Sequence, residues 1–184
     1  ADAHNNLGVA LKELGQIDAA VTSYQRALAI TPDFVNALYN LSLALQDLDK
    51  LDEAVASYQK TLAINPDYFE AHNNLGNVYQ DLGKRDEAVA SFLKALAIRP
   101  DYVEAHYNLG NTLKELGKFD EAIGSFDMAG TRLARSMSLE CNYALERYDV
   151  FHTNLATLIE TDKSNIRAAA ISAFAAQQLG CNDP

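Results

Sequence analysis

The sequence predicts an all-α protein built from repeated pairs of antiparallel helices. The chain matches itself when it is shifted by 34 residues, and each repeat holds two stretches with apolar residues at helical spacing. Glycine and proline recur between these stretches, where helices end. A single helix pair cannot bury its apolar face alone, so we expect neighbouring pairs to stack into an array.

Several columns of residues recur at this period. They are Leu7, Leu41, Leu75 and Leu109; Gly8, Ser42, Gly76 and Gly110; Leu14, Leu48, Leu82 and Leu116; Ala20, Ala54, Ala88 and Ala122; Tyr24, Tyr58, Phe92 and Phe126; and Pro32, Pro66 and Pro100. Chance does not hold this many columns in register, so the repeat is a property of the fold.

Each unit contains two predicted helices. In the opening unit the first helix carries one apolar stripe, Leu7, Ala10, Leu11 and Leu14, and the second carries another, Ala20, Val21, Tyr24, Ala27 and Leu28. Gly15 ends the first helix, Asp18 is placed to cap the second, and Pro32 closes it.

Small residues at Gly8, Ala20 and Ala27 would let the paired helices approach to about 8–10 Å. A leucine at Gly8 or Ala20 should overpack this contact and destabilise the protein by about 1–3 kcal/mol.

The order Leu-Gly, Leu-Gly, Asp-Glu-Ala, aromatic, Ala-Leu and Pro resembles the tetratricopeptide repeat. The clearest copy is AHNNLGNVYQDLGKRDEAVASFLKALAIRP, from Ala71 to Pro100. The resemblance implies a right-handed α-α superhelix, a TPR solenoid, whose first helices line a concave surface. The sequence departs from the family at its usual tryptophan, which is replaced by His4, Leu38, His72 and His106.

We predict a single array over residues 1–184. The regular units are 1–34, 35–68, 69–102 and 103–131, followed by a divergent unit, 132–165, and a terminal helix, 166–181. A short deletion after Ala129 separates the regular units from the divergent one. The terminal helix is apolar over much of its circumference, so it is either a poorly polarised cap or covered by a continuation past Pro184; we favour the continuation.

Charge and composition limit the partners. The net charge is −10, with 15 basic residues scattered among 25 acidic ones, which disfavours nucleic acid and anionic membranes. No apolar run is long enough to span a bilayer, and we expect a cytoplasmic location. Cys141 and Cys181 form no motif and are interpreted as buried thiols.

No motif for catalysis is present, so we expect neither an enzyme nor a cofactor. The repeated pairs Asp52-Glu53, Asp86-Glu87 and Asp120-Glu121 suit the positive end of a helix dipole. His4, His72 and His106 share one column on separate helices, too far apart for metal–nitrogen bonds of about 2.0–2.1 Å, and His152 stands alone. We therefore predict no metal site.

The asparagine column Asn6, Asn40, Asn74 and Asn108 carries the functional prediction, because asparagine is a mediocre helix former and packing does not require it. A carboxamide offers donors and an acceptor to the backbone of an extended peptide. The column resembles the asparagine ladder of protein O-linked N-acetylglucosamine transferases, which holds substrate peptides. Further candidate peptide-binding residues flank it: Asn77, Asn111, Asn5, Asn73, Tyr39, Tyr107, Glu70 and Glu104.

The predicted function is therefore protein–protein interaction, with a polar to mildly basic extended peptide held mainly through its backbone. Three alternatives remain. The amides only bond neighbouring helices; the chain recruits substrates for a larger glycosyltransferase, sulfotransferase or 2-oxoglutarate oxygenase; or the array self-associates through its ends, including the C-terminal helix. The clamp by which co-chaperone arrays bind acidic tails is excluded, because its places hold no basic residue: Asn5, Val9, Asn40, Glu70 and Asn74.

Overall fold

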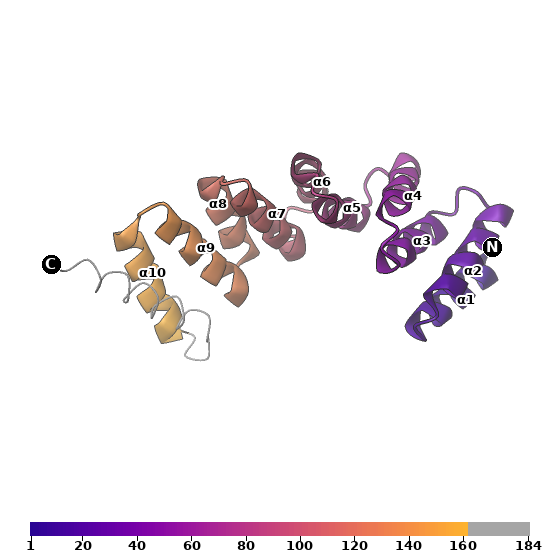
Figure 1. The fold of residues 1–184 in the computed structure, drawn as a ribbon, viewed down its shortest axis with the longest axis horizontal. Coiled ribbons are helices and arrows are strands. Elements are labelled where there is room, and N and C mark those ends of the chain that lie inside the picture. Colours follow the sequence, from indigo (N-terminus) through magenta and orange to yellow (C-terminus); the bar gives the residue numbers. More distant parts are fainter. Residues whose placement is uncertain (162–184) are drawn as a thin grey trace. The chain divides into compact units, whose positions relative to one another are not determined.

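The computed structural model describes residues 1–161, which contain ten helices and no strand. The terminal helix predicted over 166–181, and Cys181 with it, lies outside the described residues. The chain divides into two compact units, the first covering Ala1–Pro100 and the second beginning at Asp101. The all-α prediction of antiparallel helix pairs is confirmed (Figure 1).

Six helices build the first unit: α1 (Asp2–Glu13), α2 (Ile17–Ile30), α3 (Val35–Asp47), α4 (Leu51–Ile64), α5 (Phe69–Asp81) and α6 (Arg85–Ile98). The second unit contains α7 (Val103–Glu115), α8 (Phe119–Ala129), α9 (Arg132–Ala144) and α10 (Tyr148–Thr161). Within each unit every helix contacts the next one along the chain, as expected for stacked pairs. The assignment of residues 1–184 to one array stays a prediction.

A left-handed turn joins the two helices of a pair. Gly15 has φ +74° and Gly117 φ +73°, in the region that favours glycine. In the first pair the backbone N–H of Gln16 donates to the carbonyl of Leu11 at 2.9 Å, which satisfies one of the carbonyls at the helix end. Asp49 takes the glycine position of the second pair with φ 58°. This turn therefore reverses the chain between the two helices of a pair.

The predicted cap at Asp18 is wrong. The residue before α2 is Gln16, no side chain caps this helix, and Asp18 lies one residue inside its first turn. The physical reason is the tight turn between the helices. Only Gln16 separates Gly15 from the first residue of α2, so Asp18 already lies inside the helix. The acidic pairs Asp52-Glu53, Asp86-Glu87 and Asp120-Glu121 do lie in first turns, where they complement the helix dipole.

The core of a regular pair is an aromatic ring packed against a helix without a side chain at the contact point. Phe92 of α6 is fully buried, and a Cβ placed on Gly76 of α5 would lie 2.5 Å from its Cε1. Gly110 and Phe126 repeat the arrangement in the second unit at 2.6 Å. At these two positions the glycine makes room for the ring of the partner helix, whereas the second pair has the buried Ser42 in this column.

The fourth pair is shorter, as the predicted deletion requires. Helix α8 has 11 residues where α2, α4 and α6 have 14, and Gly130 ends it with φ 61°. Thr131 then caps α9, because its side-chain oxygen accepts from the N–H of Ala134 at 3.1 Å.

The divergent fifth pair fills its core by a different exchange of residues. The glycine position holds Leu139, the position of the aromatic ring holds Leu155, and the ring moves one turn back to Phe151, where regular units have alanine. All three are buried in one cluster with Leu158. All three positions now hold large apolar residues, and the aromatic ring fills the core from a different turn of the second helix.

We predict that Gly76→Ala destabilises the protein by about 1–3 kcal/mol, because the new methyl group overlaps the ring of Phe92. The matched control is Gly124→Ala in α8, where a Cβ meets nothing within 4 Å. That change should be neutral or should stabilise by about 0.5–1 kcal/mol through the lower entropy of alanine. Urea unfolding followed by circular dichroism measures both, and equal effects would contradict the packing argument.

Candidate functional site

The asparagine column lies on the first helix of each regular pair. Asn6, Asn40 and Asn74 belong to α1, α3 and α5 of the first unit, and Asn108 belongs to α7 of the second. Asn6 is exposed, while Asn40, Asn74 and Asn108 are half-buried. We call the side of α1, α3 and α5 that carries this column the asparagine face.

Two neighbouring helices are joined across the asparagine face by side-chain amides. The Nδ2 of Asn40 donates to Oδ1 of Asn5 at 3.0 Å, and the Nδ2 of Asn5 lies 3.4 Å from Oδ1 of Asn6. Asn5 is itself buried, with 8% of its surface exposed. Asn5 therefore holds the amide of Asn40 from α1, and this bond takes one of the two Asn40 N–H groups.

The next pair of helices is joined by a tyrosine in place of an amide. The Nδ2 of Asn74 donates to the hydroxyl of Tyr39 at 2.9 Å, and Asn73 donates to Oδ1 of Asn74 at 3.3 Å. Asn73 is completely buried, and the hydrogen bond that it donates helps to orient the amide of Asn74. Asn74 also forms a side-chain hydrogen bond with Tyr58, and its oxygen keeps a second acceptor position.

The ring of Tyr39 is fixed by aromatic neighbours. It stacks on Tyr68 with ring centroids 4.7 Å apart and meets Tyr58 edge to face at 6.1 Å. Its half-buried ring therefore holds a hydroxyl in place for Asn74. The sequence predicts that Tyr39 seats ligand side chains and does not point to Tyr68, because the role of Tyr68 depends on how α3 packs against the connection between α4 and α5.

The remaining candidates are half-buried or exposed. Asn77 and Glu70 lie on α5, half-buried; Asn111 and Tyr107 are half-buried on α7, where the Tyr107 ring packs 6.0 Å from that of Phe126. Glu104 is exposed and accepts from the hydroxyl of Tyr102 at 3.0 Å. The structure thus brings together the first-unit candidates on α1, α3 and α5, and it places those on α7 in the second unit.

The histidine column has a packing role at His72. This side chain is 9% exposed, and its Nε2 lies 2.9 Å from the carbonyl oxygen of Pro66. Burial lowers the pKa of His72, with the Pro66 carbonyl opposing that shift. Within residues 1–161 no group of three or more His, Cys, Asp or Glu side chains is arranged to hold a metal ion.

Cys141 is a buried thiol, as predicted. Burial raises its pKa to about 11, so the thiol is protonated at neutral pH. Over the same described part of the chain, no helix is both long enough and apolar enough to cross a membrane.

Stacked helix pairs with a repeated polar column define a helical-repeat interaction module. A family model described as "TPR repeat" matches residues 10–49, 44–83 and 80–117, and a model described as "Tetratricopeptide repeat" matches residues 105–136. These matches cover more than half of the chain, which therefore belongs to the tetratricopeptide repeat family. No curated protein sequence matches it.

Solved structures share the fold. The MamA protein superposes with a TM-score of 0.82 at 20% identity, covering 88% of this chain and 91% of that one. YrrB, described as a TPR protein with an unusual peptide-binding site, gives 0.78 at 19% identity, over 92% and 90%. TTC0263 of Thermus thermophilus, described as a thermophilic TPR protein, gives 0.62 at 25% identity, over 96% and 98%.

We predict that Tyr39 and Asn74 are coupled by about 0.5–1.5 kcal/mol, the contribution of a typical protein hydrogen bond. The coupling is measured in a double-mutant cycle with Tyr39→Phe, Asn74→Ala and the double variant, using urea unfolding. The phenylalanine keeps the ring stack and removes only the hydroxyl. Strictly additive effects would show that the bond does not orient Asn74.

We also predict that His72 makes the protein less stable in mild acid. Its folded pKa lies below its unfolded value of about 6.5, so the unfolded chain takes up the proton first as the pH falls. The contribution of neutral His72 is complete above about pH 6.5 and is lost below it. His72→Leu, which copies Leu38 of the second pair, should flatten the dependence of unfolding free energy on pH between about 5 and 7. Identical slopes for the variant and the wild type would contradict this assignment.

Proposed function

We propose that the asparagine face binds an extended polypeptide segment, chiefly through the backbone of that segment. The observation that carries the proposal is the state of Asn40 and Asn74. Each amide is held by a hydrogen bond that it donates to a neighbouring helix and still has an oxygen position for a further partner, and Asn40 also keeps a second N–H. A held amide loses little side-chain entropy on binding.

The spacing of the helices fits an extended chain. Neighbouring helices pack about 8–10 Å apart, and an extended chain advances about 3.3 Å per residue. Successive amides of the column would therefore be separated by about three residues of the ligand. Because an extended backbone turns its N–H and C=O groups to alternate sides at each residue, amides on one face can pair with ligand residues two or four positions apart. A carboxamide paired with both N–H and C=O does not discriminate among ligand side chains, so the ligands would share a conformation rather than a sequence.

Charge on this face favours polar or mildly basic ligands. Glu70 lies on α5 beside the column, and Lys12, which is near it on α1, is paired with Asp47 at 3.1 Å. The same geometry would serve a free-standing scaffold or the recruiting region of a larger enzyme, and the proposal assigns binding and no chemical step to these residues. YrrB, a protein of the same fold that is described as having a peptide-binding site, adds support.

The test uses the full chain and peptides selected from a displayed random library. The Asn40→Ala, Asn74→Ala double variant should weaken every selected peptide at least tenfold in fluorescence polarisation. Gln25→Ala, which removes an exposed carboxamide from α2, is the control and should leave the affinities unchanged. Circular dichroism verifies that each variant is folded.

Backbone recognition is tested separately on the ligand. Methylation of single backbone nitrogens should abolish binding at positions two or four residues apart, while alanine at the same positions should have little effect. Unchanged affinities in the double variant, or peptides that depend on side chains alone, would refute the proposal.

A further inference from the structure

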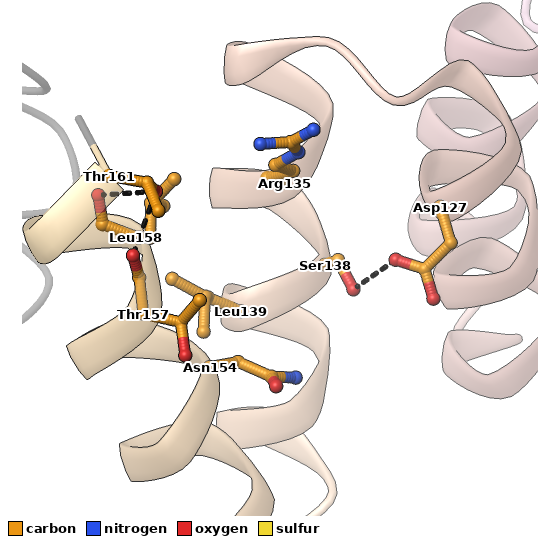
Figure 2. A pocket seen from close by; sticks show the side chains of 8 residues that line it. All are labelled: Asp127, Arg135, Ser138, Leu139, Asn154, Thr157, Leu158 and Thr161. Atoms are coloured by element: carbon orange, nitrogen blue, oxygen red, sulfur yellow. Dashed lines mark hydrogen bonds between the residues drawn. The ribbon is translucent and has the colours of Figure 1, made fainter.

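Each unit contains a pocket bounded by two successive second helices and the first helix between them. In the first unit, α4, α5 and α6 border an open pocket of about 710 Å³. Its wall includes buried Leu75 and exposed Ile98, together with His72 and Lys94. In the second unit, α8, α9 and α10 border a half-open pocket of about 330 Å³, shown in Figure 2, and most of its lining residues are exposed.

The two pockets are built from the same repeat positions. Every boundary of α9 and α10 lies the same number of residues after the corresponding boundary of α3 and α4. This shows which position of the fifth pair corresponds to which position of a regular pair. In this register six positions line both cavities: Gln59 and Asp127, His72 and Arg135, Leu75 and Ser138, Ser91 and Asn154, Lys94 and Thr157, and Ile98 and Thr161. At two of these positions an apolar residue of the first-unit pocket is replaced by a polar one in the second: Leu75 by Ser138 and Ile98 by Thr161.

Of these replacements, the change from leucine to Ser138 says most about the role of the pocket. Leu41 and Leu75 occupy this column in the first unit with 8% and 5% exposure, and Ser138 is buried to the same degree at 6%. Burial of a leucine side chain contributes about 1.5–3 kcal/mol to folding stability through the hydrophobic effect, and a serine at this position does not provide this contribution. The neighbouring core is filled by Leu139 and Phe151, so packing alone does not require a hydroxyl here.

Opposite charges lie on the wall of this polar pocket. The hydroxyl of Ser138 donates to Oδ1 of Asp127 at 3.2 Å, which holds the carboxylate at the α8 side (Figure 2). Arg135 of α9 has no ion-pair partner within residues 1–161. The hydroxyls of Thr157 and Thr161 donate to backbone carbonyls of α10 at 3.0 and 2.7 Å, so their oxygens remain as acceptors.

We propose that this pocket binds a free α-amino acid. The guanidinium of Arg135 would pair with the ligand carboxylate, the bidentate contact for which arginine is suited. Asp127 and the threonine oxygens would accept from the ligand ammonium group. One cation and one anion on the wall of a cavity near the lower limit of ligand pockets, about 300 Å³, match a small zwitterion better than a peptide or a multivalent anion.

The test titrates the ¹⁵N-labelled full chain with the twenty common L-amino acids at millimolar concentration and follows backbone amide signals by NMR. At least one amino acid should shift the signals of α9 and α10 in a saturable way and leave those of α1 to α6 in place. Removing the carboxylate or the ammonium group from that ligand should weaken binding at least tenfold. For L-serine the two comparison compounds are ethanolamine and 3-hydroxypropionate, which keep its hydroxyl.

Matched variants assign the charges. Arg135→Leu should weaken binding at least tenfold, whereas Arg132→Leu, which removes an arginine of the same helix that does not line the pocket, should not. Asp127→Asn should weaken the amino acid and spare 3-hydroxypropionate. The proposal is overturned if no amino acid shifts these signals, if ethanolamine binds as tightly as serine, or if both arginine variants behave alike. Asn40 and Asn74 lie in the other unit, so this result does not depend on peptide binding by the asparagine face.

Discussion

The contact between a glycine on the first helix and an aromatic ring on the second determines most of the structure. Gly76 must lack a side chain because the ring of Phe92 occupies its Cβ position. This contact fixes which side of α5 faces α6. Asn74 comes two residues earlier, about 200° around the helix, and is therefore turned away from α6. The asparagine face follows from the packing of the pair.

The fifth pair shows that the contact can be exchanged without losing the core. Leu139 replaces the glycine, and Phe151 supplies the ring from a position where regular units have alanine. The asparagine column ends at the same place, because its position on α9 holds Met137, 8% exposed. The first helix of this pair therefore lacks the amide found on the other first helices. On the side that lines the pocket it carries Ser138 and Arg135.

The period, the helix pairs and the short fourth pair could be predicted from the sequence, because each depends on residues that recur at fixed spacing. The cap at Asp18 was predicted wrongly because its position relative to the helix end depends on how tightly the chain turns at Gly15. The bonds from Asn40 to Asn5 and from Asn74 to Tyr39 join residues 35 apart, one more than the repeat. They depend on how neighbouring first helices are rotated, and a column of identical residues carries no such information.

The first helix α5 therefore contributes to two separate surfaces. On α5, Asn74 points to the asparagine face, while Leu75 and His72 belong to the pocket between α4 and α6. The array can thus vary its pocket in one pair, as at Ser138, and keep its amides in the others. This separation is the physical reason why a repeat with one fixed core has room for both of the proposed binding sites.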